Sequence, residues 1–424
     1  MQPSQGRARV SIRAAALWFV PALLASCVQI SRASEQTPSL EISSPVENTE
    51  VAGPVNLIEV SGLASPGPFV EQDLVVVVDV SSSTLLPSGV DVNGNGRVGR
   101  ETLRLSRDRP VWLSVSTDPG DSVRAAEFFA AHRLLDAVDS RRTRVGLVVF
   151  EARVRKSLSV SAPREQLEAA LHHFQEMDAD LGGNTNFAVA LREALKGLEV
   201  APSGSGEVKR ARHVIFLSDG MPNEPAPMEH AAQEALAAAG ALRDAGADIL
   251  AFVLGHPEQE GGDLAVYSKM SELTGGSMTR LPNPADVIAR VPRIDLVGIT
   301  AVDITNQTTG EAARALRLGP DGSFDGFVSL QPGENWIRVR VHDREGRSAE
   351  LRRLVVYSPR EPKDPEEARR FDEAGKLLLE KLRARSVEVQ LVHEIEQARS
   401  QEATQDRELE LRRAPEQETP SHAP

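Results

Sequence analysis

Three short segments of this sequence carry hydroxyl and carboxylate side chains next to apolar runs. They are D-V-S-S-S at 79–83, directly after four valines, G-G-N-T-N at 182–186 and F-L-S-D-G at 216–220. In an open parallel sheet, ligands bind outside the carboxyl ends of the strands, where we expect these segments to gather. Hydroxyl and carboxylate oxygens are hard ligands that suit Mg²⁺ or Mn²⁺. The three segments therefore predict a site for a divalent cation.

Each segment taken alone also has a simpler interpretation. Serine and aspartate are favoured in turns and at helix N-caps, so one segment of this kind does not distinguish a metal site from a cap. A motif gains weight only when its structural context agrees with it. Here three segments belong to the same predicted sheet, and their agreement favours the metal site.

The three segments resemble the metal-ion-dependent adhesion site of the von Willebrand factor A family, and they occur in that family's order. The resemblance extends over the region 71–292 and implies five metal-binding residues, which are Asp79, Ser81, Ser83, Thr185 and Asp219. In the family, the serine and threonine hydroxyls contact or closely approach the cation, and the aspartates act largely through bound water. The resemblance therefore implies a bound Mg²⁺, or else Mn²⁺ or Ca²⁺, whose remaining position accepts a carboxylate of a protein partner.

A second acidic segment, D-V-N-G-N-G-R-V-G at 91–99, lies in a predicted insert at 84–118. Its oxygen side chains at positions one, three and five and its glycine at position six resemble the start of an EF-hand loop, which binds Ca²⁺. The end departs from that pattern, because Thr102 is at position twelve and the glutamate falls one place earlier. A surface loop of Asx turns is the alternative. The residues that would hold Ca²⁺ are Asp91, Asn93, Asn95, Arg97 and Glu101.

The region 71–292 alternates apolar runs with amphipathic segments, which predicts an α/β fold with a doubly wound, mainly parallel sheet flanked by helices. Four runs rich in valine, isoleucine, leucine and phenylalanine predict strands covered on both faces, at 74–80, 144–150, 214–218 and 249–254. Helices are predicted at 122–138, 164–174, 187–198, 230–245 and 263–274. Gly246 and Gly275 are placed to end the last two helices.

The flanking stretches 39–70 and 293–359 contain short apolar runs separated by turn sequences, which predicts a smaller all-β domain. Residues 333–346 resemble the closing strands of bacterial immunoglobulin-like modules through the pattern G-x-N-x-I-x-V-x-x-x-D-x-x-G. We therefore expect an immunoglobulin-like β-sandwich that is split by insertion of the α/β domain into one of its loops. The alternative is that 40–65 forms a loose extended lead and 295–358 a free-standing sheet.

The first residues of the chain have the composition of an export signal. A basic start is followed by the apolar run 14–24, which is too short to span a bilayer as a permanent helix. The sequence L-A-S-C at 24–27 resembles the lipobox of bacterial lipoproteins, which implies a lipoprotein signal peptide at 1–27 and lipidation of Cys27. The alternative is an ordinary secretory signal that is cut near Ser31 or Ala33.

Lipidation of Cys27 implies attachment to a membrane at the N-terminus, with residues 28–38 as a polar tether. Stable anchoring needs more than one acyl chain, and lipidation of this kind supplies several. Val28 follows the cysteine in place of an aspartate, and by the sorting habit of lipoproteins this favours the outer membrane. We therefore expect an outer-membrane lipoprotein of the bacterial cell envelope, facing the periplasm or the exterior.

The region 360–413 is charged and rich in alanine, leucine, glutamate and arginine. Its apolar residues recur at approximately helical spacing, which predicts a long helix or a short coiled coil that could support oligomerisation. Residues 414–424 are rich in proline, glutamate and serine and cannot build a core, so we expect them to be disordered.

The composition argues against several functional classes. With 41 % hydrophobic and 26 % charged residues, the chain has the balance of a soluble globular protein. The formal net charge of −13 argues against a nucleic-acid partner, because phosphate binding needs a clustered basic surface. The sequence contains no G-x-S-x-G, H-E-x-x-H or G-x-x-x-x-G-K motif, so we expect that the protein is not an enzyme.

The sequence therefore predicts a metal-dependent protein-binding module, for adhesion or scaffolding, that is anchored in the bacterial envelope. The main alternative is a structural or assembly protein that acts through its C-terminal helix, with the metal only stabilising the fold. A hydrolase with an unrecognised catalytic group is a third hypothesis.

Overall fold

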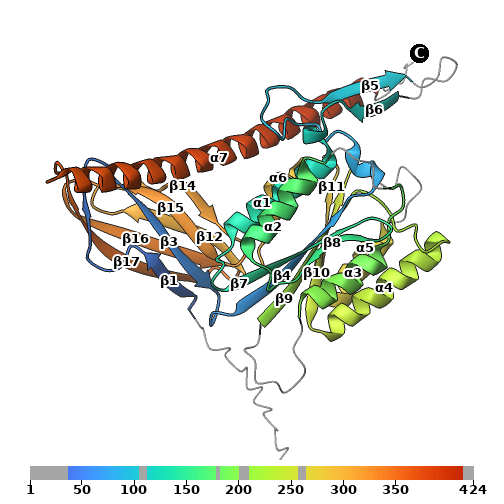
Figure 1. Ribbon diagram of the computed structural model, residues 1–424, viewed down its shortest axis with the longest axis horizontal. Coiled ribbons are helices and arrows are strands. Elements are labelled where there is room, and N and C mark those ends of the chain that lie inside the picture. Colours follow the sequence, from blue (N-terminus) through green and yellow to red (C-terminus); the bar gives the residue numbers. More distant parts are fainter. Residues whose placement is uncertain (1–36, 105–111, 178–181, 200–209, 256–263, 414–424) are drawn as a thin grey trace, which may run out of the picture. The chain divides into compact units, whose positions relative to one another are not determined.

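The computed structural model describes residues 37–104, 112–177, 182–199, 210–255 and 264–413 (Figure 1). The predicted signal peptide, Cys27 and nearly all of the predicted tether lie outside the described residues, and so does the predicted disordered tail at 414–424. No helix in the described segments is long and apolar enough to cross a membrane. The described elements form a mainly parallel sheet with its helices, a β-sandwich and a short hairpin.

The mainly parallel sheet has six strands in the order β11-β10-β9-β4-β7-β8, and β8 alone runs antiparallel to its neighbour. The strands are β4 (Glu71–Asp79), β7 (Thr143–Phe150), β8 (Val154–Leu158), β9 (Arg210–Ser218), β10 (Ala247–Leu254) and β11 (Ser277–Leu281). The chain winds away from β4 in both directions, to β7 on one side and to β9 on the other. The predicted doubly wound sheet is confirmed, and β4 lies at its switch point.

Helices cover both faces of this sheet. They are α1 (Val123–Ala137), α2 (Arg164–Gln175), α3 (Phe187–Gly197), α4 (Met228–Asp244), α5 (Ala265–Thr274) and α6 (Asp286–Arg290). Alternate side chains of β4 point to opposite faces: Leu74, Val76 and Val78 join the core with α1, α2 and α6, whereas Val75 and Val77 join the core with α3, α4 and α5 (Figure 1). Because both faces are apolar, both must be covered.

The helix ends follow local capping chemistry. The Ser122 hydroxyl accepts a hydrogen bond from the backbone N–H of Ala125 at 3.1 Å and so caps α1. Gly246 and Gly275 follow α4 and α5 with φ of 72° and 78°, a left-handed conformation that glycine adopts without strain. The sequence does not predict β8, β11 or α6, because they are short and the two strands carry partly exposed polar side chains.

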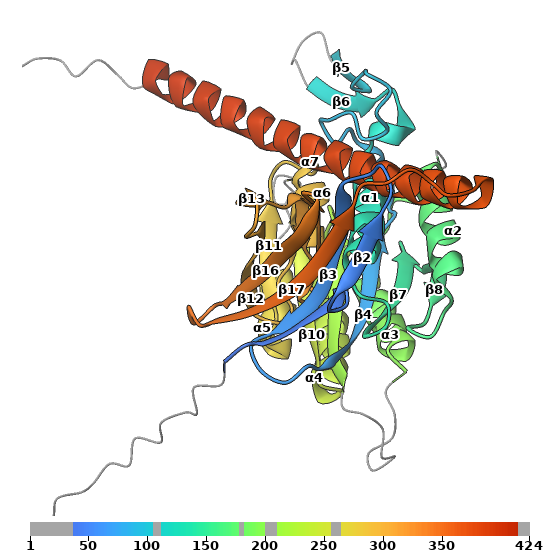
Figure 2. The ribbon, with the colours of Figure 1, turned by 90° about the vertical axis from the view of Figure 1, so that its left-hand side faces the viewer.

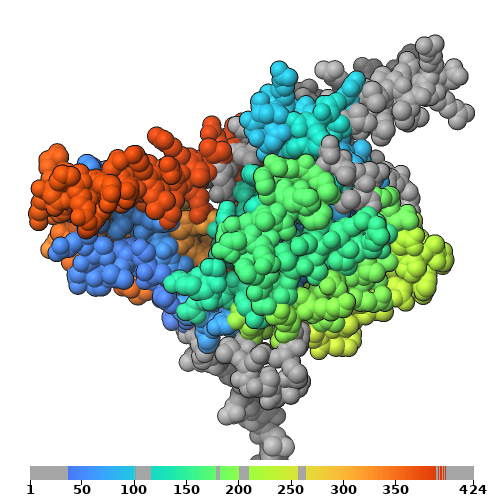
Figure 3. Space-filling view, viewed as in Figure 1, coloured from blue at the N-terminus to red at the C-terminus, as the bar shows by residue number. Residues whose placement is uncertain are grey.

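The predicted insert joins the loop after β4 to the first turn of α1. It begins within η1 (Ser82–Leu85), contains a hairpin of β5 (Arg100–Arg104) and β6 (Trp112–Ser116), and ends just before η2 (Pro119–Asp121). The Val123 N–H donates to the Leu86 carbonyl, and the Ser88 N–H donates to the Asp121 carbonyl, both at 2.8 Å. These bonds fix the insert to the start of α1, and Figure 3 shows the hairpin, in cyan, standing out on the surface.

The β-sandwich has two sheets. One sheet has the order β1-β3-β15-β14 and the other has the order β13-β12-β16-β17-β2. The bounds are β1 (Ser39–Ser44), β2 (Thr49–Ala52), β3 (Leu57–Ser65), β12 (Ile299–Asn306), β13 (Glu311–Ala312), β14 (Arg314–Leu318), β15 (Ser323–Ser329), β16 (Gly333–Asp343) and β17 (Ser348–Ser358). Because β3 pairs with β15 and β2 pairs with β17, the chain before and after the parallel sheet contributes to both layers. Val60, Phe324, Val339 and Val355 are buried between them.

The turn between β14 and β15 contacts the end of α1 and the start of β7. Asp321 Oδ2 accepts hydrogen bonds from the Thr143 hydroxyl at 2.7 Å and from the Asp139 N–H at 2.8 Å. Gly322 in the same turn has a φ of 79°, and a Cβ there would lie 2.1 Å from the carbonyl oxygen of Ala64. Only glycine therefore allows this turn to approach β3 so closely.

The C-terminal helix α7 (Pro365–Arg413) begins later than the predicted start at 360, because Asp364 caps it by accepting the Glu367 N–H at 2.8 Å. It lies against β3 and β14 (Figures 1 and 2). Lys381 pairs with Glu59 at 2.7 Å, and Val392 and Ile395 are buried. One side of the helix is therefore used in packing.

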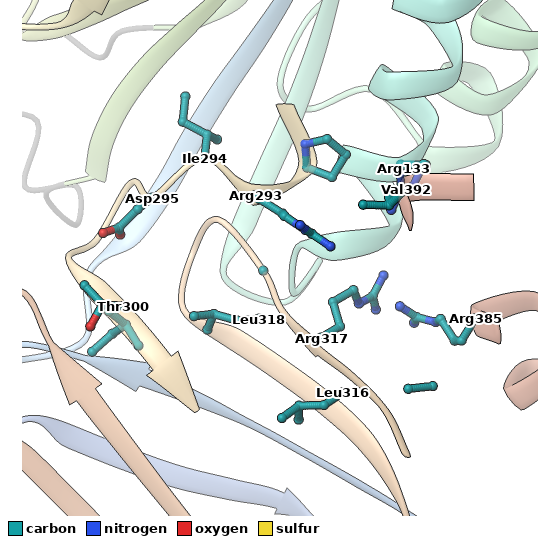
Figure 4. Close-up of a pocket in the computed structure, with 14 residues that line it drawn as sticks. Arg133, Arg293, Ile294, Asp295, Thr300, Leu316, Arg317, Leu318, Arg385 and Val392 are labelled. Atoms are coloured by element: carbon teal, nitrogen blue, oxygen red, sulfur yellow. The ribbon is translucent and has the colours of Figure 1, made fainter. Parts of the chain in front are cut away.

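A cavity of about 530 Å³ lies between α1, η4 (Val291–Arg293), β14 and α7 (Figure 4). Its described lining combines aliphatic side chains with four arginines, which are Arg133, Arg293, Arg317 and Arg385. Arg317 and Arg385 both contact Asp325, at 2.7 Å and 3.2 Å, so the arginines help to hold α7 on the sandwich. None of the five predicted metal-binding residues is in the described lining.

Asn335, the asparagine of the G-x-N pattern, is fully buried and closes the turn before β16. Its Oδ1 accepts hydrogen bonds from Asn306 Nδ2 and the Gln331 N–H, both at 2.9 Å, and its Nδ2 donates to the carbonyls of Gln331 and Gly333 at 2.8 Å and 3.0 Å. Asn335→Ala should lower the free energy of unfolding by about 2–4 kcal/mol, because it leaves buried polar groups unpaired. Urea unfolding followed by circular dichroism measures this loss. The nearby exposed amide of Gln307 is the control, and equal effects of Asn335→Ala and Gln307→Ala would contradict the assignment.

Candidate metal centre

The five predicted metal-binding residues lie in three loops at one edge of the parallel sheet. Asp79 ends β4, Ser81 and Ser83 begin η1, and Asp219 directly follows β9. Because β4 and β9 are parallel neighbours, their carboxyl ends lie side by side. Thr185 precedes the first turn of α3 and joins them from the third loop.

Hydrogen bonds link the two partly exposed predicted ligands, Ser83 and Asp219, to the buried Ser81 and Asp79. Ser83 Oγ donates to Asp219 Oδ1 at 2.8 Å and lies 3.1 Å from Ser81 Oγ. Asp79 is fully buried, and its Oδ1 accepts the Ser81 N–H at 2.9 Å while its Oδ2 accepts the Ser218 hydroxyl at 2.6 Å. Both oxygens of Asp79 are thus held in fixed directions by neighbouring donors.

Oxygens of two of the loops lie around a common point beside Gly220, which belongs to the third loop. A Cβ placed on this glycine would lie 3.6 Å from Thr185 Oγ1, 3.8 Å from Ser83 Oγ and 3.9 Å from Asp79 Oδ2. The absence of a side chain at Gly220 therefore keeps a small space open beside oxygens of two segments, 79–83 and 182–186, and Asp219 of the third segment is joined to them through Ser83. The structure brings the predicted ligand set together.

This donor set fits a hard divalent cation. Carboxylate and hydroxyl oxygens are the ligands that Mg²⁺ and Mn²⁺ prefer, and Mg²⁺ usually retains several waters. Within the described segments, no three His, Cys, Asp or Glu side chains are grouped closely enough to share a metal. A cation at this edge would therefore depend on the hydroxyls of Ser81, Ser83 and Thr185 as much as on the two aspartates.

The loop that carries Thr185 is fixed by hydrogen bonds to the loop after β9. Asn223 Oδ1 accepts the Thr185 N–H at 2.7 Å, and the N–H groups of Asn223 and Glu224 donate to the Thr185 carbonyl at 3.0 Å and 3.2 Å. The Ser82 N–H donates to the Gly182 carbonyl at 3.0 Å, which ties this loop to η1 as well. The relative positions of the three loops are thus set by backbone bonds.

A buried arginine side chain supports the loop after β4. Arg124 in α1 is fully buried, donates to the Val80 carbonyl at 3.0 Å and lies 3.3 Å from Thr84 Oγ1. Burial raises the pKa of Asp79, while hydrogen bonds from Ser218 and Ser81 and the charge of Arg124 oppose this rise. A divalent cation would act in the same sense as Arg124 and favour the ionised carboxylate.

Glu127, one turn further along α1, is also fully buried. Neither of its carboxylate oxygens has a hydrogen-bond partner among the described residues. Burial, reinforced by the carboxylates of Asp219 and Asp79, raises the pKa of Glu127 well above its ordinary value, and Arg124 only partly offsets this. The surroundings therefore favour the protonated form of this side chain in the metal-free protein.

The segment 91–99 folds around the carboxylate of Asp91. Asp91 Oδ1 accepts the Gly94 N–H and Oδ2 accepts the Gly96 N–H, both at 2.7 Å. Asn93 Oδ1 accepts the Asn95 N–H at 3.0 Å, and Asn95 Oδ1 accepts the Arg97 N–H at 2.9 Å. These are consecutive Asx turns, the conformation that both an EF-hand-like loop and a plain surface loop would use.

Two carboxylates outside the segment contact it. The side-chain amides of Asn93 and Asn95 donate to Asp118 Oδ2 at 3.0 Å and 2.6 Å, and the Asn93 amide is the largest cause of a lowered pKa at Asp118. Asp121 accepts the N–H groups of Val92 and Gly99, both at 2.9 Å. Glu101, the predicted closing ligand, is exposed on β5 instead. The structure thus brings Asp118 rather than Glu101 to this loop.

Sequence reasoning does not assign four of the residues that build the site. Ser218 adjoins Asp219 in the segment 216–220, so its closeness to the site could have been predicted from sequence. Arg124 and Glu127 are charged residues three apart at the start of an apolar helix, a spacing that places both on one face. Tyr267 contacts the site from α5 and has no local sequence signal.

Residues 124–280 match the family model of the von Willebrand factor type A domain, so the chain contains such a domain. The match runs from the first turn of α1 into β11 and includes Thr185 and Asp219. It begins after the insert, and the segment 79–83 therefore lies upstream of it, although β4 is central in the same sheet. No curated protein matches the chain.

Several solved structures are similar to part of the chain. Proximal thread matrix protein 1 from the mussel byssus, with a zinc-occupied MIDAS motif, is 16 % identical with a TM-score of 0.32, over 52 % of this chain and 46 % of that one. An aerotolerance-related membrane protein from Bacteroides fragilis is 16 % identical with a TM-score of 0.33, over 51 % and 95 %. Manganese-loaded TRAP protein from Plasmodium vivax is 12 % identical with a TM-score of 0.33, over 70 % and 97 %. The chain thus spans less than half the length of the mussel protein.

Burial of Glu127 predicts how the stability of the metal-free protein depends on pH. Because the folded state keeps this proton after the unfolded chain has released it, at about pH 4.3, the contribution of Glu127 to stability falls as pH rises above that value. In EDTA, the free energy of unfolding should therefore decline less steeply between pH 5 and pH 8 for Glu127→Gln than for the wild type. The full effect of one proton is about 1.4 kcal/mol per pH unit.

Urea unfolding at several pH values gives these slopes. The exposed glutamate of α4, Glu229, provides the matched control, since Glu229→Gln should leave the slope unchanged. Identical slopes for the wild type and Glu127→Gln would contradict the proposed protonation of Glu127.

Proposed function

We propose that this protein is a metal-dependent protein-binding module, used for adhesion or scaffolding, and not an enzyme. The cation would be held by Asp79, Ser81, Ser83, Thr185 and Asp219. The observation that carries the proposal is the convergence of oxygens from the loops at 79–83 and 182–186 on the space beside Gly220, with Asp219 hydrogen-bonded to Ser83. The von Willebrand factor type A match supports it, because domains of this family generally bind protein partners.

The hydrogen bonds of the site indicate which of these residues would contact the cation directly and which would contact it through water. Asp79 and Asp219 already accept hydrogen bonds from Ser218 and Ser83, which favours contact with the cation through water. The hydroxyls of Ser81, Ser83 and Thr185 are neutral, so they would leave much of the positive charge uncompensated. A carboxylate from a protein partner is the group that completes such a site, with Mg²⁺ as the cation and Mn²⁺ or Ca²⁺ as alternatives.

The same proposal places the protein in the bacterial envelope. Its support is the apolar run 14–24 and the L-A-S-C sequence at 24–27, which favour export and a lipid on Cys27 in the outer membrane. The net charge of −13 disfavours nucleic-acid partners. A lipid at the N-terminus would hold the metal-binding domain at a membrane surface, available to a protein partner.

An assembly role for α7 is the second candidate. One side of α7 packs on the sandwich, but Leu377, Leu379 and Val387 are 57 %, 41 % and 65 % exposed. These exposed aliphatic side chains are the groups through which a second chain would contact the helix. Complexes formed in this way would survive EDTA, whereas complexes formed through the metal centre would not.

Asp79→Ala should abolish Mn²⁺ binding and, with it, metal-dependent capture of envelope proteins. The reason is that Asp79 orients the Ser81 backbone and belongs to the loop that supplies two hydroxyls. Isothermal titration with Mn²⁺ and a pull-down from envelope extract measure the two effects. Asp303→Ala, at an exposed carboxylate of β12, is the control. Capture that survives both Asp79→Ala and EDTA would contradict the proposed function.

We also propose that the segment 91–99 binds Ca²⁺ with Asp91, Asn93, Asn95 and the backbone of Arg97, with Asp118 in the place predicted for Glu101. Addition of Ca²⁺ should then raise the melting temperature of the full chain, and Asp91→Ala should remove this rise. Asp118→Asn should weaken it, whereas Glu101→Gln should not. If Ca²⁺ raises the melting temperature of the wild type and of Asp91→Ala equally, the segment is a plain surface loop and does not bind Ca²⁺.

A further inference from the structure

We propose that Tyr267 is a positioning residue that holds the three metal-binding loops together, an inference that rests on the proposed function. Tyr267 lies in the first turns of α5 and is fully buried. Its hydroxyl lies 3.1 Å from Ser218 Oγ and also contacts the carbonyl oxygen of Gly220. Ser218 Oγ in turn donates to Asp79 Oδ2 at 2.6 Å. One hydroxyl therefore acts on the loop after β9 and, through Ser218, on the carboxylate that ends β4.

The aromatic ring of Tyr267 reaches the remaining loop. The ring lies 5.1 Å from the ring of Phe187 at an angle of 63°, and 6.3 Å from the ring of Phe216 at 68°. Phe187 begins α3, directly after the loop that carries Thr185, and Phe216 lies in β9 just before Asp219. These edge-to-face contacts are favourable aromatic geometry. A single side chain from α5 thus contacts elements next to two groups of predicted ligands and reaches the third, at the end of β4, through Ser218.

The hydroxyl has a defined chemical task. Burial raises the pKa of Tyr267 well above its ordinary value, so the side chain keeps its proton and remains a donor. Ser218 has one hydroxyl proton, which it gives to Asp79, so the single proton of Tyr267 is shared between a lone pair of Ser218 Oγ and the Gly220 carbonyl. Loss of the tyrosine hydroxyl would remove one of the three hydrogen-bond partners of Ser218 Oγ and leave the Gly220 carbonyl without this donor. We therefore expect Tyr267 to orient Asp79 and to fix the backbone beside Gly220, where the oxygens converge.

This arrangement also couples α5 to the metal centre. Tyr267 is held by α5, while the atoms that it contacts belong to the loops that would bind the cation. A displacement of α5 would therefore change metal affinity without touching any ligand. By linkage, cation binding would favour the position of α5 seen here.

The chain has two tyrosines, and they form a matched pair for the test. Tyr357 in β17 is also buried, and its hydroxyl donates to the Gly53 carbonyl at 3.0 Å, within the sandwich. Tyr267→Phe and Tyr357→Phe each remove one buried hydroxyl and keep the ring. In EDTA, we expect the two variants to lose similar amounts of thermal stability. In Mn²⁺ titrations of the full chain, we expect Tyr267→Phe to bind roughly 3- to 30-fold more weakly than wild type, and Tyr357→Phe to bind as wild type does.

A double-mutant cycle tests the route through Ser218. If Tyr267 acts on Asp79 through Ser218, then Ser218→Ala combined with Tyr267→Phe should weaken Mn²⁺ binding little more than Ser218→Ala alone. Additive losses in the double variant, or wild-type affinity of Tyr267→Phe, would overturn the positioning role. The proposed function would still stand in that case if Asp79→Ala abolishes Mn²⁺ binding. Absence of Mn²⁺ binding by the wild type would instead overturn both. If Mn²⁺ binds and the variants lose affinity as expected, but the protein captures no partner in a metal-dependent way, the role of Tyr267 stands and the proposed function is contradicted.

Discussion

Two carboxylates at the ends of adjacent parallel strands impose the main constraint on this structure. Asp79 ends β4 and Asp219 follows β9, and Asp79 is removed completely from solvent. A buried carboxylate is costly unless donors or positive charge compensate it. The chain meets this requirement with the Ser218 hydroxyl, the Ser81 N–H and the buried guanidinium of Arg124. A divalent cation would complete the compensation, and this explains why so many hydroxyls gather at one edge.

The opposite ends of the same strands carry a different kind of polar network. At the start of β4, Asp73 is buried between Arg144 and Arg210, at 2.8 Å and 2.6 Å. The charges of these side chains compensate one another. The amino ends of the strands face the sandwich, because β3 of the sandwich leads into β4 after a short link. The sandwich therefore holds the amino ends of the strands, and the carboxyl ends are left to the loops of the metal centre.

The features that could be predicted from sequence are those whose signal is local. The strand β4 contains a run of four valines, and the three polar segments lie directly beside their strands or helix, so both could be identified without tertiary information. The residues that complete the site are long-range neighbours. Tyr267 comes from α5, and Asp118 contacts the loop at 91–99 from the far side of the hairpin. Glu101 was expected at that loop because spacing along the chain cannot show that the hairpin carries it away on β5.

The most direct test of the account is the position of a bound ion. Crystals grown with Mn²⁺ should show an anomalous difference peak beside Gly220, at about 2.0–2.3 Å from the hydroxyl oxygens of Ser81 and Ser83, with the carboxylates of Asp79 and Asp219 nearby. Asp79→Ala crystals grown in the same way should lack the peak. A well-ordered site without a peak, or a peak only at the loop 91–99, would contradict the claim that these three loops form a metal centre.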